Sequence, residues 1–460
     1  MRAPALINAD LPEFGEPSVQ PNIPAATYGK RVADALQRAN HAGFDALVVY
    51  GDREHAANIA YLSGYDPRFE EALLVLTSDR MPHLLVGNEG WSYAELAAGS
   101  FERLLCQTFS LPGQPRDRQL PLAELLAAAG LKTGMLIGAV GWKIFEPSDP
   151  GATADWLDLP EFIARALRAI GPTANATGIF QNPADGLRAI SDVDQLACFE
   201  FAACYSSNAL RNVLFGLRPG MTELEASRLM ALPGLPLACH TMLSAGPRAS
   251  RGLPSPSARV IAKGEPLTMA VGIQGALTAR AGFVVEDARG LPDGVGDYVE
   301  KLVAPYFAAV VEWYETIGIG VTGGALYAII AKHLGDPFFG VGLNPGHLIH
   351  IDEWMHSPIF PGSDIALRSG MAIQVDVIPA THSPWFTTNI EDGIALADTD
   401  LRAEFAGNYP EAWARIQARR AFMADVLGIQ LRAEVLPFSN IPAYLPPFLL
   451  SPSRVLAIRK

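Results

Sequence analysis

The spacing of apolar residues along the first third of the chain predicts an α/β domain. Val32, Leu36 and Ala39 recur at helical spacing and Gly43 follows them, which indicates a helix that starts near Tyr28. Apolar runs of strand length then follow at residues 46–50, 71–77, 83–86 and 134–141. Because helical and strand patterns alternate, we expect an α/β layer with a mainly parallel sheet.

The second part of the chain has longer helical patterns and fewer strands. A long helix is predicted over residues 192–215, and Thr222 and Glu225 have the spacing of a capping box that begins the next helix. Further helices are expected over residues 298–317, 324–334 and 410–427. Strands are predicted over residues 372–378 and 389–397.

Changes in composition divide the chain into three segments. Residues 1–27 are rich in Pro, Asn and Glu without a period, which indicates an arm that wraps a surface or is disordered. A loop-like composition near residues 175–185 marks a domain boundary. We therefore expect a smaller domain over residues 28–180 and a larger one over 181–460.

Composition limits the classes of partner. Hydrophobic residues make up 49% of the 460 residues, which is typical of a folded globular chain. The net charge of −13 disfavours a nucleic-acid partner, and no apolar run approaches the length of about 20 residues that a membrane helix needs. The four cysteines include no Cys-x-x-Cys pair and no signal peptide is evident, so we expect a cytoplasmic protein.

The larger domain begins with a distinctive motif, Leu-Arg-Ala-Ile-Ser at 187–191, and continues with Leu-Arg-Pro-Gly-Met-Thr-Glu at 217–223. These motifs resemble those of the pita-bread family of methionyl aminopeptidase, Xaa-Pro aminopeptidase, prolidase and creatinase. In the smaller domain, 43–49 and 58–65 resemble the creatinase and prolidase branch. The resemblance implies an α+β protein, with a C-terminal pita-bread domain preceded by a smaller α/β creatinase-type domain. It also implies a homodimer.

The resemblance implies a site for two metal ions, held by two aspartates, one histidine and two glutamates. His347 in Pro-Gly-His matches the histidine, and Glu391 matches one glutamate. Asp376 stands where the family has the other glutamate. Ala270 stands where the first aspartate is expected, and no acidic residue lies between Glu265 and Glu286 to supply the second. We therefore expect no metal cofactor; the alternative is a divalent metal at a rebuilt site.

Creatinase hydrolyses a C–N bond without a metal, with a histidine that follows a Ser-Gly-x-Asn loop. The corresponding loop here is Ser-Ala-Gly-Pro at 244–247, and the histidine is missing from 252–256. The sequence thus departs from both chemistries of the fold that it resembles.

The remaining polar residues nevertheless define a candidate site. We expect His347 to transfer protons with help from His350 or His240, and Asp376 and Glu391 to bind a cationic group or orient water. His350 has a structural role as its alternative, and a salt bridge to Arg280 is the alternative for the two carboxylates. Candidate substrate-binding residues are Arg280, His240, His356 and Trp354.

Three functions follow from this sequence. The first is metal-independent hydrolysis of a C–N bond in a small amide or guanidino-like substrate. The second is a catalytically inactive homologue that binds a small ligand or a protein. The third is a peptidase of Xaa-Pro type with a metal held by His347, His350, Asp376 and Glu391.

Overall fold

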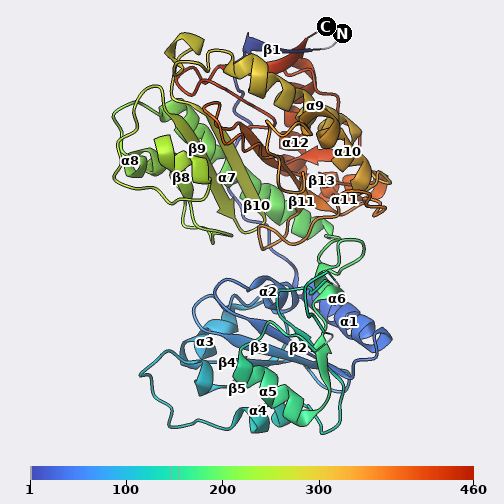
Figure 1. The fold of residues 1–460 in the computed structure, drawn as a ribbon. Coiled ribbons are helices and arrows are strands. Elements are labelled where there is room, and N and C mark those ends of the chain that lie inside the picture. Colours follow the sequence, from blue (N-terminus) through green and yellow to red (C-terminus); the bar gives the residue numbers. More distant parts are fainter. Residues whose placement is uncertain (1–2, 147, 154, 460) are drawn as a thin grey trace. The chain divides into compact units, whose positions relative to one another are not determined.

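The computed structural model describes residues 3–146, 148–153 and 155–459, and it divides into two compact units. One unit spans 22–189, and the other comprises the chain up to Pro21 together with residues 190 onward. The sequence analysis placed the boundaries at 27/28 and 180/181. The N-terminal segment contributes a strand to the larger unit, because β1 (Ala3–Asn8) pairs antiparallel with β15 (Arg454–Arg459) (Figure 1).

The smaller unit contains a six-stranded sheet in the order β5-β4-β3-β2-β6-β7. Its strands are β2 (Ala46–Gly51), β3 (Ala72–Thr77), β4 (His83–Val86), β5 (Glu102–Leu105), β6 (Ile137–Val140) and β7 (Thr173–Asn175). The sheet is mainly parallel, as the alternation of elements predicted: of these six strands, β3 alone runs in the opposite direction, antiparallel to β2 and β4. Only residues 78–82 connect β3 to β4, which is too short for the crossover that parallel strands need.

Side chains of this sheet alternate between two apolar layers. Leu47, Val49 and Leu74 belong to one buried cluster, and Val48 and Val75 belong to the other. The helices of this unit cover these layers: α1 (Ala25–His41), α2 (Ala57–Ser63), α3 (Asn88–Tyr93), α4 (Leu122–Ala128), α5 (Glu161–Ile170) and α6 (Gly178–Gln181). Burial on both faces explains why these strands are continuous apolar runs in the sequence.

The larger unit is built on a seven-stranded antiparallel sheet in the order β11-β12-β13-β10-β9-β8, with β14 paired to β13. The strands are β8 (Met242–Ala245), β9 (Pro266–Ile273), β10 (Ala276–Phe283), β11 (His347–Leu348), β12 (Ala372–Asp376), β13 (Asn389–Leu396) and β14 (Val435–Pro437). The strands predicted over 372–378 and 389–397 are confirmed as β12 and β13. This sheet positions the candidate site.

Helices flank this sheet. The long predicted helix is α7 (Val193–Gly216), which packs along β9 and β10 (Figure 1) and is capped by Asp192 through Gln195 N. The capping box is confirmed at α8 (Glu223–Arg228). The other helices are α9 (Ala304–Thr316), which follows a π-helical turn at Val299–Val303, α10 (Gly323–Leu334), α11 (Thr399–Asn408) and α12 (Pro410–Asp425). None of the described helices is long and apolar enough to cross a bilayer.

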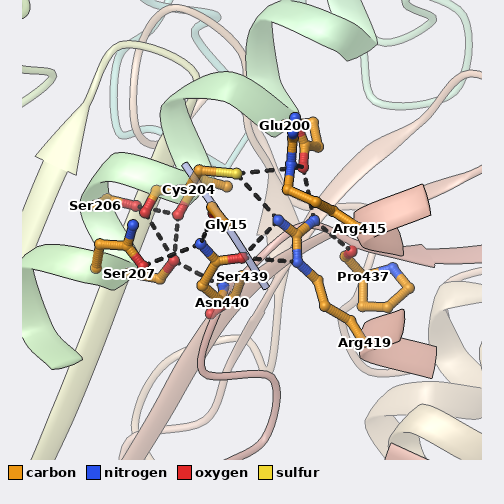
Figure 2. A network of polar contacts seen from close by, with 12 residues as sticks. Gly15, Glu200, Cys204, Ser206, Ser207, Arg415, Arg419, Pro437, Ser439 and Asn440 are labelled. Atoms are coloured by element: carbon orange, nitrogen blue, oxygen red, sulfur yellow. Dashed lines mark hydrogen bonds and ion pairs between the residues drawn. The ribbon is translucent and has the colours of Figure 1, made fainter. Parts of the chain in front are cut away.

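A buried ionic network joins α7 to α12 and the C-terminal segment (Figure 2). Glu200 accepts from Arg415 Nε and Nη2 at 2.9 and 2.6 Å, and Arg419 Nη1 lies 2.8 Å from its Oε1. Arg419 also donates to Asn440, whose amide reaches the carbonyl of Gly15. Burial by itself would raise the pKa of Glu200, but the charges of Arg419 and Arg415 hold it below its ordinary value.

Candidate active site

One row of side chains crosses the sheet of the larger unit and changes from apolar to acidic half-way. The strand register places Met242 opposite Ala270, Ala270 opposite Ala279, Ala279 opposite Glu391, and Glu391 opposite Asp376. Residues directly opposite one another in an antiparallel pair lie on the same face of the sheet. The row is therefore apolar on β8, β9 and β10, and acidic on β13 and β12.

His347 and Glu353 complete the acidic half. His347 lies at the start of β11, the strand beside β12, and its side chain is fully buried. Its Nε2 lies 3.3 Å from Glu353 Oε1, 3.7 Å from Glu391 Oε1 and 4.0 Å from Asp376 Oδ2. Three carboxylates thus surround a single imidazole nitrogen.

The orientation of the His347 ring is fixed by its neighbours. Nδ1 lies 3.2 Å from the carbonyl oxygen of Leu348, which only accepts, so Nδ1 carries the proton. The indole of Trp354 stacks on the ring with centroids 4.2 Å apart and planes 19° from parallel. Within the described part of the chain, no hydrogen-bond partner meets Nε2 or Asp376 Oδ1. In the neutral ring, Nε2 is an acceptor that faces other acceptors, so the cluster needs a proton or a cation at its centre.

The raised pKa values of the three carboxyl groups also indicate that the cluster requires a proton or a cation. Burial raises the pKa of Asp376 and of Glu391 well above the ordinary carboxyl range, and repulsion by neighbouring carboxylates adds to both shifts. Burial also raises the pKa of Glu353, while His347 opposes that shift. Desolvated like charges cannot all remain ionised without compensation, so the cluster has a high affinity for positive charge.

The cluster opens into a cavity of about 750 Å³. Glu353, Asp376 and Glu391 line its acidic side, and Met242 and Leu277 line an apolar side. Arg251, His240 and His382, which are exposed, also line the cavity. His382 and Phe386 have left-handed backbone angles, with φ of 48° and 64°, which is a strained conformation for these residue types and typical of functional loops.

Four of the predicted site residues lie close together. The structure brings together His347, Asp376 and Glu391, with Trp354 stacked on the imidazole. His240 lines the same cavity, and its Nε2 lies 2.8 Å from the carbonyl of Leu253. Their catalytic and substrate-binding roles stay predictions.

The sequence analysis did not assign a role to Glu353. This residue lies in the loop after β11 and reaches the cluster because the loop folds back: Leu348 and His356 form an isolated β-bridge. The available signal was the acidic pair Asp352–Glu353 close behind His347, but the sequence did not show which of the two carboxylates points inward.

Arg280 does not lie beside Asp376 and Glu391 as expected. Its guanidinium forms a buried ion pair with Asp392 at 2.7 Å and also donates to the carbonyls of Tyr444 and Ile441. Neighbouring strand residues point to opposite faces, so Arg280 shares the α7 side of β10 with Thr278, which bonds Ser206 on that helix. The predicted substrate contact is corrected to a structural ion pair.

His350 and His356 are also placed differently from the prediction. His350 is fully buried and packs edge-on against Phe199 of α7, with ring centroids 5.1 Å apart. His356 is half-buried, and its Nδ1 accepts from Ser357 N at 2.9 Å. Among the described residues that line the cavity, neither histidine occurs. The expected help of His350 in proton transfer is therefore replaced by a packing role against α7.

The site does not fit two metal ions but fits one. Ala270, where the first aspartate was expected, and Ala279, in the stretch expected to supply the second, belong to an apolar cluster with Met242 and Leu277. None of these four side chains offers a carboxylate or an imidazole. By contrast, one ligand atom each from His347, Glu353 and Glu391 lies within 4.8 Å of the other two. Carboxylates with a single imidazole suit a hard or borderline divalent ion. The expectation of a metal-free mechanism has no support in this geometry.

Comparisons with known proteins bear on the fold. No family model matches the sequence, and a search of curated proteins finds no match. Solved structures do match. The Xaa-Pro dipeptidase from Bacillus anthracis is 18% identical with a TM-score of 0.60, over 81% of this chain and 96% of that one.

Two further structures agree with the first. The prolidase from Pyrococcus horikoshii is 17% identical with a TM-score of 0.61, over 80% of this chain and 95% of that one. The X-Pro aminopeptidase from Thermotoga maritima is 16% identical with a TM-score of 0.60, again over 80% and 95%. The chain thus has the pita-bread fold with the preceding α/β domain, which confirms the fold that the motifs implied. At these identities, the likeness establishes the fold alone.

Proposed function

We propose that the chain is a hydrolase that cleaves a C–N bond in a small amide or peptide-type substrate, with the cavity above His347 as its active site. One observation carries the proposal: Nε2 of His347 and the carboxylates of Glu353, Asp376 and Glu391 converge on the buried floor of an open cavity. Solved proteins with this fold are named as Xaa-Pro dipeptidase, prolidase and X-Pro aminopeptidase, which supports amide chemistry.

In this proposal, His347, Glu353 and Glu391 hold one divalent cation. When bound, such an ion polarises an amide carbonyl and increases the acidity of water. The stacked Trp354 and the carbonyl of Leu348 keep Nε2 of His347 directed at the site. Asp376 stands farthest from Nε2 and has a raised pKa, so it is suited to take a proton from water and return it to the leaving amine.

The experiment combines metal loading with a substrate panel. Purified protein is incubated separately with Mn²⁺, Co²⁺ and Zn²⁺, and is assayed for amine release from Xaa-Pro dipeptides, other dipeptides and acyl p-nitroanilides. We expect turnover with at least one ion, and a loss of about 100-fold or more in Asp376→Asn. The matched control is Asp364→Asn, because Asp364 is exposed.

A second candidate function is binding without catalysis. The apolar half of the row supports it, since that half lacks the acidic residues that the fold's two-metal chemistry would use. Saturable binding of amides, with no turnover under any metal condition, would favour this candidate and overturn the hydrolase.

A further inference from the structure

The apolar half of the row stands where a two-metal site would need its aspartates. Met242 of this half and Leu277 of the same apolar cluster line the cavity that also contains the acidic half. We propose that the apolar half is a substrate subsite for an uncharged apolar group, such as an alkyl chain, carried directly beside the amide bond. The role of this subsite in catalysis rests on the proposed hydrolase function. Its preference among ligands can be tested separately, by binding measurements.

Register fixes how close the two halves are. Ala279 lies opposite Glu391, and residues so paired have Cβ atoms about 4.5–5.5 Å apart. The apolar wall therefore begins within one side-chain length of the carboxylates. A ligand whose polar group reaches Glu391 and Glu353 places its next carbon atoms near Leu277 and Met242, the members of this wall that line the cavity.

Two side chains of the wall, Met242 and Leu277, line the cavity, and we call the part of the cavity that they bound the recess. Ala270 and Ala279 are buried beside them in the same apolar cluster. A ligand group that enters the recess therefore meets the thioether of Met242 and the branched alkyl group of Leu277. Cys239 packs against this cluster at the cavity side.

The chemistry of the wall selects against charge. The side chains of Met242, Ala270, Leu277 and Ala279 offer no strong hydrogen-bond donor or acceptor. Burial raises the pKa of the Cys239 thiol to about 12, so it is uncharged at neutral pH. A charged ligand group placed against these four side chains would lose its hydration without gaining a partner from them. An anionic group held there, away from the exposed Arg251 of the same cavity, would also be repelled by the carboxylates across the row.

The test uses graded acyl chains on the cation-loaded full chain. Turnover is measured with acetyl, butanoyl, hexanoyl and succinyl p-nitroanilides, and binding is measured by calorimetry with acetamide, butanamide, hexanamide and succinamate. We expect kcat/KM and affinity to rise about fourfold per methylene until the recess is full. The succinyl compounds should fall at least 100-fold below butanoyl.

Substitutions in the wall give the second measurement. Ala270→Val adds bulk beside Met242 and Leu277, narrows the recess and should lower the hexanoyl-to-acetyl preference at least tenfold. Leu277→Ala, which remains informative if the valine variant fails to fold, enlarges the recess and should move the preference to a longer chain. The matched control is Leu224→Ala on α8, whose side chain is 44% exposed and outside the cavity lining; its chain-length preference should equal that of the unaltered protein.

The outcomes separate the subsite from the proposed function. Turnover without any dependence on chain length, or a preference for succinyl, overturns the subsite and leaves the hydrolase standing. Binding that strengthens with chain length, without turnover of any compound, supports the subsite and overturns the hydrolase. Chain-length dependence that Ala270→Val and Leu277→Ala do not change places the recess elsewhere and overturns the subsite.

Discussion

Ala279 of β10 and Glu391 of β13 lie directly opposite each other, and the row of side chains that crosses the sheet changes from apolar to acidic between them. On the side of Glu391 the row continues to Asp376, and on the side of Ala279 it continues to Ala270 and Met242. Only one half of the row can therefore hold a cation. The predictions below follow from this asymmetry and from the ionic contacts outside the site.

The chain should bind one divalent cation rather than two. Elemental analysis after loading with Mn²⁺, Co²⁺ or Zn²⁺ and dialysis should give about one ion per chain, because the apolar half offers no ligands. Glu353→Gln should weaken binding by at least about 10- to 100-fold, which is the range for losing a residue that only supports a metal ligand, because Glu353 is itself proposed as a ligand. Glu161→Gln, at an exposed surface position, is the control. A stoichiometry of two would contradict the one-cation site.

Without a cation, stability should fall as pH rises. The pKa of Asp376 is raised on folding, so the folded state holds its proton where the unfolded state has lost it. The stabilisation is complete below the unfolded pKa of about 4 and is lost as pH increases toward the folded pKa, with a slope of up to about 1.4 kcal/mol per pH unit for this group.

The measurement is urea unfolding of chelator-treated protein between pH 4.5 and 8. Asp376→Asn removes the titrating group, so its stability curve should be flatter than that of the unaltered protein, whereas Asp364→Asn should follow the unaltered curve. Identical slopes in all three proteins would show that Asp376 does not titrate in this range.

The buried pair between Glu200 and Arg419 should be important for stability. Glu200→Gln leaves the guanidinium of Arg419, which is fully buried, without its counter-charge, and should cost about 3–5 kcal/mol of unfolding free energy. Denaturant unfolding measures this loss. Glu161→Gln is the control, because its pair with Arg165 is exposed and contributes less than about 1 kcal/mol. Equal effects of the two substitutions would contradict the role of the network in Figure 2.

Arg280 should act on stability and not on ligand selection. Arg280→Lys keeps the charge beside Asp392 but loses the fork that also donates to Tyr444 and Ile441, so we expect a loss of about 1–3 kcal/mol in unfolding free energy. Cation affinity and amide binding should change less than threefold. A large change in amide affinity at unchanged stability would restore the substrate contact that the sequence predicted.

Local patterns were sufficient for the elements and for part of the site. The apolar runs that became β2, β3 and β4, and the Thr222–Glu225 capping box, depend on contacts between neighbours in the chain or on burial of a whole segment. The resemblance of their motifs to those of the pita-bread family brought forward His347, Asp376 and Glu391, which lie in β11, β12 and β13. The absence of acidic residues between Glu265 and Glu286 already indicated that two metals would not fit.

The tertiary structure decided which side chains meet. Arg280 pairs with Asp392 rather than Glu391 because a shift of one residue along a strand reverses the face, and the sequence does not reveal which face each strand turns to the cavity. Glu353 joins the cluster because the loop that carries it folds back onto β11. The spacing of apolar residues in the sequence does not predict such a return. The row from Met242 to Asp376 depends on the register of β8, β9, β10, β13 and β12, whose residues are far apart in the chain. The sequence therefore determined which chemical groups are present, and packing determined which of them share one face and one cavity.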